Sequence, residues 1–335
     1  MKRKGLLITL GIIGLLVVVS VTGFMPEKPV YKPVMPALQL TSETAGQYVN
    51  DKEAGIPNIK PDNASKVIYS NDSLKQQTDY CLLYLHGFTA SWKEGYPTNS
   101  KLAEEFGMNA YFPRLASHGL DTPDPLIDMT PDNLWESAKE ALVIAQALGK
   151  KVVVMATSSG AILALRMAVL YPERIAGIIM LSPNVRINNP AAFILSKPFG
   201  LQLGRMISGG NYRIIEQDPA LDLYWYKQYR VEGVIYLQQL VETSMKKELF
   251  KKVIQPVYTG YYFNDKEHQD NTVKVSSMLW MLENLGTPPE ILVSQAFPDA
   301  GAHVIGSELT NPNWKEVFDS VEDFVVNKLK ISKIY

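Results

Sequence analysis

The chain has 335 residues, of which 46% are hydrophobic and 20% charged, and its net charge is −1. This size suffices for one large domain with an insertion, and the charge balance lacks the basic surplus typical of nucleic-acid-binding proteins. The single cysteine excludes an internal disulfide framework, the four histidines lack metal-site spacing, and no nucleotide-binding glycine motif follows a strand. We therefore expect no nucleic-acid partner, no metal and no cofactor.

The N-terminal segment, residues 1–25, has the pattern of a membrane anchor. Residues 5–24 are apolar or small, and they follow the basic residues Lys2, Arg3 and Lys4. A helix rises about 1.5 Å per residue, so this run is just long enough to cross a bilayer. The pattern predicts an uncleaved signal-anchor with the rest of the chain outside the cytoplasm. Secretion after cleavage of a signal peptide is the alternative.

Residues 26–65 have the composition of a linker. Pro26, Pro29, Pro33 and Pro36 predict a stiff, extended spacer. Polar residues without clear periodicity continue to about Ser65. We expect a spacer and leader that lie over the following domain.

Strands and helices alternate from residue 66 to the C-terminus. The predicted strands cover residues 66–70, 80–85, 109–112, 152–154, 174–181, 257–262 and 291–293. The predicted helices cover residues 101–106, 130–148, 159–171, 273–285 and 311–329. This alternation predicts an α/β fold, in which helices cover both faces of a mostly parallel sheet. Residues 185–252 interrupt it with a helical-looking stretch rich in aromatic residues.

Ser158 lies where a predicted strand meets a predicted helix. Val152, Val153 and Val154 form an apolar run, and the sequence after Ser158 is typical of a helix. A serine at such a sharp reversal is typical of a nucleophile elbow, whose usual pattern is G-x-S-x-G. Here the pattern is A-x-S-x-G, because Ala156 stands at the first small position and Gly160 at the second. The alternative is that Ser158 or Ser159 only caps the helix.

A serine nucleophile needs a base and a third group that holds the base. In a parallel sheet such groups gather at the carboxyl ends of the strands. Asp265 follows the strand at 257–262, and His303 follows the strand at 291–293. We predict Ser158 as nucleophile, His303 as base and Asp265 as acid. Asp270 and Glu267 are the alternative acids, and His268 lies in a polar loop that fits a solvated role.

The order Ser, Asp, His along the chain resembles that of the α/β-hydrolases. Short matching pieces support the resemblance: His86–Phe88, Ser117–Gly119, Tyr171–Ile175 and Gly301–His303. From about residue 66 to the C-terminus the chain is most similar to carboxylesterases and monoacylglycerol-lipase-like enzymes. The resemblance implies an α/β-hydrolase fold with a helical cap at about 185–252.

The same resemblance implies roles for further residues. The backbone N–H groups of Phe88 and Ser159 would form the oxyanion hole, and His86 and His118 would be structural. Residues that would bind substrate are Phe88 and, in the cap, the aromatic residues Tyr224 and Trp225. Tyr226, Phe193 and Met206 would extend this apolar pocket.

These assignments predict a serine hydrolase that cleaves lipid-like or small carboxylic esters through an acyl-enzyme on Ser158. A peptidase, a thioesterase or an acyltransferase would use the same three residues. The alternative from another class is a catalytically silent binding protein that keeps the fold.

Overall fold

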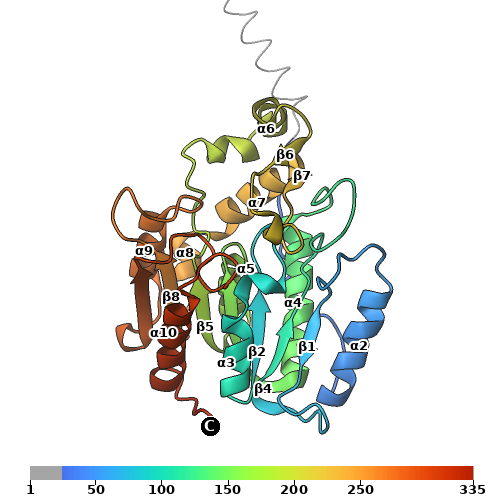
Figure 1. Cartoon of the computed structure of the whole chain (residues 1–335), viewed down its shortest axis with the longest axis vertical. Coiled ribbons are helices and arrows are strands. Elements are labelled where there is room, and N and C mark those ends of the chain that lie inside the picture. The colour runs from blue at the N-terminus through green and yellow to red at the C-terminus, as the bar shows by residue number, and fades with distance from the viewer. Residues whose placement is uncertain (1–24, 335) are drawn as a thin grey trace, which may run out of the picture.

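The computed structural model describes residues 25–334, and its centre is a seven-stranded sheet (Figure 1). The strands are β1 (Lys66–Ile68), β2 (Thr78–Leu85), β3 (Asn109–Phe112), β4 (Gly149–Thr157), β5 (Ile175–Leu181), β8 (Val257–Tyr262) and β9 (Leu292–Phe297). They lie in the order β1-β3-β2-β4-β5-β8-β9, and every neighbouring pair is parallel except β1 with β3. The predicted mostly parallel sheet is confirmed.

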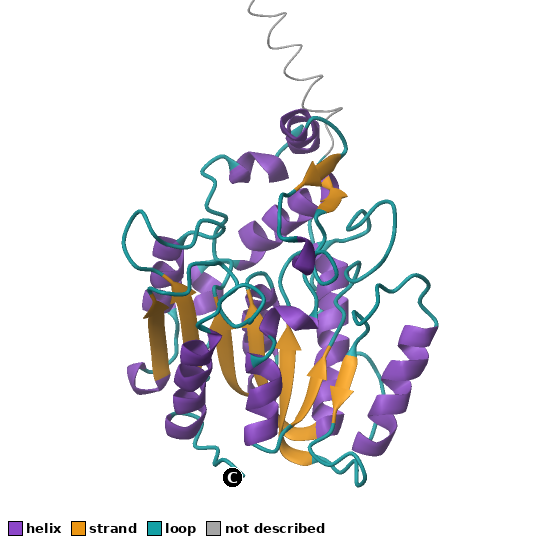
Figure 2. Ribbon diagram, viewed as in Figure 1, coloured by secondary structure: helices purple, strands orange, loops and turns teal. Residues whose placement is uncertain are grey.

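Helices cover both faces of the sheet (Figure 2). Outside the cap they are α2 (Ser42–Ala54), α3 (Thr98–Glu105), α4 (Pro131–Leu148), α5 (Gly160–Leu170), α9 (Val275–Asn284) and α10 (Trp314–Asn327). The apolar side chains of α4 and α5 share one core cluster with one face of the sheet, and those of α3 and α10 share a second cluster with the other face. This two-faced cover is what the alternation of strands and helices predicts.

The valine run of β4 shows why the central strands lack polar residues. Val152 and Val154 point into the core shared with α4 and α5, while Val153 points into the core shared with α3 and α10. All three are fully buried. Each buried valine side chain contributes about 1.5–3 kcal/mol to stability, so β4 is anchored from both sides. A firmly held strand is what a strained turn at its end requires.

The cap is inserted between β5 and β8. Its regular segments are short 3-10 helices at Ala192–Ser196 and Pro219–Leu221, helices α6 (Gly200–Ser208), α7 (Val231–Ser244) and α8 (Lys247–Phe250), and strands β6 (Tyr212–Ile214) and β7 (Gln228–Arg230). Strands β6 and β7 form an antiparallel ribbon that the sequence did not predict. Figure 2 shows α6, α7 and this ribbon above the arrowheads of the central strands. The cap therefore covers the end of the sheet where the predicted site residues gather.

The leader runs along the domain before it forms a helix. Residues 25–41 contain no helix or strand, and their carbonyl groups accept hydrogen bonds from the domain. Trp135 donates to Lys32 (2.9 Å), and Tyr171 donates to Pro33 (2.7 Å). Helix α2 follows and begins with a capping box at Thr41. Helix α2 corrects the prediction of a spacer and leader without regular structure at residues 26–65.

Within residues 25–334, no helix is long and apolar enough to cross a membrane. The predicted anchor, apart from Met25, lies outside the described residues. Cys81, the single cysteine, lies fully buried in β2, and this burial raises the pKa of its thiol.

Candidate active site

The chain reverses at Ser158, between β4 and α5. Ser158 has φ +51°, a left-handed backbone conformation that is strained for a residue with a side chain. Its N–H donates to the carbonyl of Leu181 (3.0 Å), and its carbonyl accepts the N–H groups of Ala161 (3.2 Å) and Asn184 (3.0 Å). Ser159 precedes α5 but makes no side-chain capping bond. The geometry is that of the predicted elbow, and the alternative of a serine cap finds no hydrogen bond to support it.

Gly160 is required because strand and helix approach closely behind the elbow. A Cβ atom on Gly160 would lie 2.1 Å from the carbonyl oxygen of Leu85, closer than any real contact. Ala156, at the other small position, is fully buried between Leu85 and Met180 of the neighbouring strands. Its methyl group fits there, which explains how the A-x-S-x-G pattern forms the same turn.

One ring nitrogen of His303 is hydrogen-bonded to a carboxylate, and the other has no hydrogen-bond partner among the described residues. Its Nδ1 donates to Oδ2 of Asp270 (2.6 Å), which leaves Nε2 as the basic nitrogen. Nε2 is buried and has no hydrogen-bond partner among residues 25–334. Burial lowers the pKa of His303, but the charge and hydrogen bond of Asp270 and the charge of Glu94 together raise it above its ordinary value. This nitrogen is suited to accept a proton from a neighbouring hydroxyl.

The prediction that Asp265 holds the histidine is wrong. Asp265 is exposed and pairs with His268, whose Nδ1 lies 2.9 Å from its Oδ2. That hydrogen bond, with the N–H groups of the same turn, lowers the pKa of Asp265. After β8 the chain makes an excursion that is closed by a bridge between Phe263 and Gln269. Asp265 lies at the outer part of this excursion.

Asp270 takes the position that was predicted for Asp265. Its N–H donates to the carbonyl of Tyr262 (3.2 Å), so it returns to the end of β8. Its Oδ1 accepts the N–H groups of Thr272 (2.8 Å) and Val273 (3.0 Å), while Oδ2 accepts His303. The Asp270 side chain is fully buried. Its two oxygens are therefore fixed in direction, and it was one of the two alternatives that the sequence left open.

The turn after β2 and the elbow each present a backbone N–H group without an acceptor among the described residues. Within the described chain, the N–H groups of Phe88 and Ser159, predicted to bind an oxyanion, donate no hydrogen bond. The N–H of Leu115 donates to Nε2 of His86 (3.1 Å), so the ring carries its proton on Nδ1 and donates to the carbonyl of Gly87 (2.9 Å). Burial lowers the pKa of His86 well below its usual range, so this neutral ring is a fixed part of the turn.

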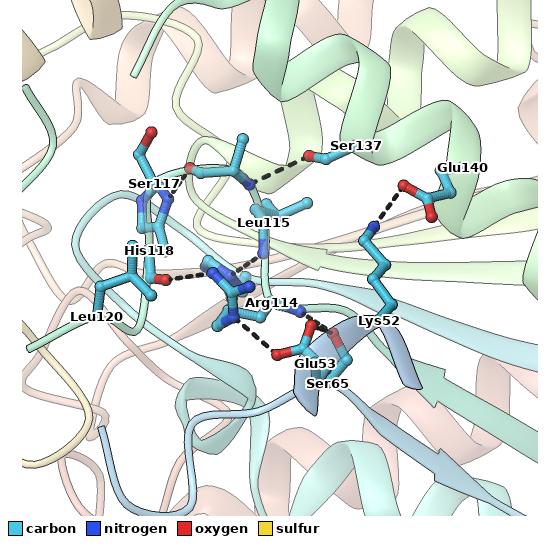
Figure 3. A network of polar contacts seen from close by, with 12 residues as sticks. Lys52, Glu53, Ser65, Arg114, Leu115, Ser117, His118, Leu120, Ser137 and Glu140 are labelled. Carbon is cyan, nitrogen blue, oxygen red and sulfur yellow. Dashed lines mark hydrogen bonds and ion pairs between the residues drawn. The ribbon is translucent and has the colours of Figure 1, made fainter. Parts of the chain in front are cut away.

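A polar network supports the loop behind this turn (Figure 3). Arg114 donates to the carboxylate of Glu53 in α2 (2.9 Å) and to the carbonyl of His118 (3.0 Å). His118 Nδ1 donates to the carbonyl of Ala116 (2.8 Å), and burial lowers the pKa of His118 to about 4. Both histidines before the elbow are thus neutral and structural. Helix α2 of the leader thus helps to support the predicted oxyanion turn, residues 86–89.

Ser158 and His303 line one cavity of about 860 Å³ beneath the cap. Phe88 and Trp225, both predicted to bind substrate, also line it. The other lining residues are mostly apolar and include Ile187, Leu195, Leu203, Val231, Val234 and Leu237. Most of these come from the cap, so the cap forms much of the cavity wall.

Several predicted pocket residues lie elsewhere. Tyr224 does not line the cavity, because its hydroxyl donates to Asp62 (2.8 Å) and its ring lies against Trp92. Tyr226 does not line the cavity either, because its hydroxyl accepts the N–H of Leu120 (2.6 Å) and donates to the carbonyl of Ser117 (3.5 Å). Phe193 and Met206 are exposed on the outer surface of the cap. The prediction that these four residues line the pocket was wrong, because aromatic content alone does not tell which face of the cap a side chain occupies.

A family model for the alpha/beta hydrolase family matches residues 82–304. The chain belongs to this family. The match runs from β2 to the loop of His303, and it therefore includes the oxyanion turn, the elbow, the cap and Asp270. The predicted α/β-hydrolase fold is confirmed.

Solved structures agree with the fold of this α/β-hydrolase. One is from work on LipS and LipT, two metagenome-derived lipolytic enzymes, with TM-score 0.62, 17% identity, and coverage of 80% of this chain and 99% of that chain. Another is a monoacylglycerol lipase from Paleococcus ferrophilus, with TM-score 0.56, 15% identity, and coverage of 78% and 97%. A third is a monoglyceride lipase from Saccharomyces cerevisiae, with TM-score 0.57, 11% identity, and coverage of 78% and 90%. A search of curated proteins gives no match.

The cavity of this α/β-hydrolase is lined by one more carboxylate, which its sequence did not predict. Glu94 lies in a 3-10 helix (Trp92–Gly95), is buried, and lines the same cavity as Ser158 and His303. Burial raises its pKa to about 7, against the opposing effects of the Gly87 N–H, the charge of His303, and the side chains of Tyr84 and Trp225. No motif marks this glutamate in the sequence, because only the fold brings it to the oxyanion turn.

Proposed function

We propose that this protein is a serine hydrolase that cleaves carboxylic esters through an acyl-enzyme on Ser158. The observation that carries the proposal is the free Nε2 of His303, which is buried in the cavity that Ser158 lines while Nδ1 is held by Asp270. A base so oriented, next to a serine on a strained turn, is the arrangement that nucleophilic acyl transfer requires.

The reaction follows from this geometry. Nε2 of His303 takes the hydroxyl proton as Oγ of Ser158 attacks the ester carbonyl, and the N–H groups of Phe88 and Ser159 stabilise the oxyanion. The imidazolium then returns the proton to the leaving alcohol, and the C–O bond of the ester breaks. Water, deprotonated by the same nitrogen, then attacks the acyl carbon. The bond between this carbon and Oγ of Ser158 breaks, the imidazolium returns the proton to Oγ, and the acid is released. The carboxylate of Asp270 stabilises the imidazolium in both halves of the reaction.

The cavity wall favours an acyl ester with an apolar chain. Leu195, Leu203 and Leu237 line it, and it is large enough for a ligand of drug size. Lipolytic enzymes and monoacylglycerol lipases are among the proteins that share the fold. We therefore propose lipid-like or small apolar acyl esters as the substrate class.

The decisive test is labelling with a fluorophosphonate, which reacts only with an activated serine. We expect an adduct on Ser158, located by mass spectrometry, that disappears in Ser158→Ala and falls strongly in His303→Ala. His268→Ala is the matched control, because the exposed His268 side chain pairs with Asp265, and its labelling should equal that of the wild type. Absence of an adduct on folded wild-type protein would contradict the proposal and favour a binding protein.

Turnover separates the related reactions. A panel of p-nitrophenyl esters of increasing chain length, with matched thioesters and anilides, gives kcat/KM for each class. We expect the esters to be preferred and longer apolar chains to lower KM. A preference for anilides or thioesters would instead identify a peptidase or a thioesterase, and product formation with an added alcohol would identify an acyltransferase.

We further propose that residues 5–24 attach the protein to a membrane, with the hydrolase domain outside the cytoplasm. Their apolar sequence and the basic residues before it, Lys2, Arg3 and Lys4, support this proposal. Detergent should be needed to extract the full chain but not a chain lacking residues 1–25. A mature N-terminus near residue 24 in the culture medium would instead indicate secretion after cleavage.

A further inference from the structure

Glu94 is a carboxylate in a buried position, where carboxylates are unusual. It is 2% exposed, and a buried ionised carboxylate is costly unless hydrogen bonds and charges compensate for lost hydration. Its Oε2 accepts the N–H of Gly87 (2.5 Å) and the hydroxyl of Tyr84 (3.2 Å). The first of these bonds reaches the oxyanion turn, and the second reaches β2.

The contacts of Glu94 connect it to the elbow as well. A Cβ atom on Gly87 would lie 2.8 Å from Oε1 of Glu94 and 3.0 Å from Cβ of Ser158, so both groups lie against the same point of the turn. The Tyr84 hydroxyl also hydrogen-bonds Oγ1 of Thr157 (3.0 Å), the residue before the nucleophile. One chain of polar contacts thus joins the end of β4, strand β2 and the turn at Gly87.

We propose that Glu94 is a positioning residue for the ester hydrolysis proposed above: its carboxylate fixes the oxyanion turn through the Gly87 N–H and adds a second negative charge beside His303. The residue after Gly87 is Phe88, whose N–H is assigned to the oxyanion. A turn that is free to rotate at Gly87 would move this donor, and displacement of a preorganised donor is costly to catalysis.

The charge of Glu94 acts on the same histidine as the charge of Asp270. The groups that face His303 are Asp270, from the loop after β8, and Glu94, from the 3-10 helix, and the charges of both raise its pKa. Those that face Glu94 are Tyr84 on β2, Trp225 in the cap and His303 itself. Because the charge of Glu94 favours the imidazolium, it stabilises the protonated base that forms during each half of the reaction.

Two conservative variants separate the two effects. Glu94→Gln keeps the reach to Gly87 and removes the charge, so the acid limb of kcat/KM should move to lower pH by about half a unit or more. Glu94→Asp keeps the charge and shortens the side chain, so kcat should fall about tenfold with KM within about twofold while the limb stays in place. A Glu94→Gln limb at the wild-type pH, or wild-type kcat in Glu94→Asp, would overturn the proposal.

A control and a second variant keep the test sharp. Glu232→Gln removes another buried glutamate, which pairs with Arg205 and Arg230 outside the cavity, and it should leave the limb where it is. If Glu94→Gln does not fold, Tyr84→Phe serves instead: its lost hydrogen bond raises the pKa of Glu94, so less of the carboxylate is ionised beside His303 and the limb should move to lower pH. An unmoved limb in Tyr84→Phe would count against the proposal.

A titration that needs no turnover distinguishes this proposal from the function on which it rests. The imidazole of His303 can be followed by NMR and assigned with His303→Gln. We expect its pKa to be lower in Glu94→Gln than in wild type. A wild type that neither labels nor hydrolyses esters would end the proposed function, whereas an unchanged His303 pKa in Glu94→Gln would end the role of Glu94.

Discussion

The carboxylate of Asp270 orients the His303 ring and favours its protonated form. Asp270→Asn keeps the shape but can leave the ring with the wrong nitrogen protonated, and such a change in a catalytic triad costs up to about 10⁴-fold in kcat. We therefore expect kcat to fall by about 10²–10⁴-fold in Asp270→Asn. Asp265→Asn is the matched control and should stay within about twofold, because Asp265 is exposed and faces His268. Equal losses in the two variants would contradict the assignment of Asp270.

His118 gives a second prediction at this scale, on stability. Burial lowers its pKa to about 4 in the folded state, against 6.5 when unfolded, so the unfolded chain binds more protons between these values. Folding stability should therefore fall by about 3 kcal/mol as the pH drops from about 6.5 to 4. In His118→Gln this part of the fall should vanish, as measured by urea unfolding at several pH values. A variant with the full wild-type pH dependence would contradict it.

Single residues differ in how well the sequence reveals them. Ser158 could be predicted because the small residue Gly160 and the valine run mark the turn around it. His303 could be predicted because it follows a strand end in the expected order. Asp270 could not be chosen over Asp265, because the bridge between Phe263 and Gln269 that displaces Asp265 joins residues whose pairing no local pattern specifies. Glu94 was harder still to predict from the sequence, because the residues that contact it come from other elements.

The contact between β2 and α5 carries a prediction about packing. Gly160→Ala places a methyl group 2.1 Å from the Leu85 carbonyl, so strand and helix must separate, at a cost of about 1–3 kcal/mol or more. The serine should lose reactivity with it. Gly55→Ala is the control, since its Cβ would meet the Lys52 carbonyl at 3.4 Å, and its unfolding free energy should change little. Thermal unfolding with fluorophosphonate labelling measures both effects.

Elements were predictable where burial imposes a strong pattern. Strands β2, β4 and β8 are apolar runs because they are covered on both faces, and α4 begins at Thr130 with the predicted cap and proline. Helix α2 was missed because little more than Ala45 and Val49 faces the core, which gives no clear period. Strands β6 and β7 were missed because each has only three residues.

At the scale of the whole molecule, the leader connects the cap to the body of the domain. Tyr31 hydrogen-bonds Thr243 of α7 (2.6 Å) and lies against Arg166 of α5, while the buried Lys139 of α4 donates to the Val34 carbonyl (2.6 Å). The alternation of strands and helices predicted the α/β body, but a proline-rich sequence cannot tell which surface it covers.

Truncation tests this connection. Removing residues 1–40 should lower the free energy of unfolding by about 3–6 kcal/mol relative to removing residues 1–25. The longer deletion removes the buried side chain of Tyr31 and several hydrogen bonds between the leader and the domain. Differential scanning calorimetry of the two truncated chains gives the comparison. Equal melting temperatures would mean that the leader only lies on the surface.

Because its single cysteine, Cys81, is fully buried, the folded protein should not react with thiol-alkylating dyes. Because strand β2 lies between β3 and β4, a reagent reaches this sulfur only when the middle of the sheet opens. The rate at which Cys81 is alkylated under native conditions therefore measures how often the middle of the sheet opens. A cysteine introduced at the exposed Met206 would be the single dye site on the folded molecule, and its fluorescence would report the movements of the cap.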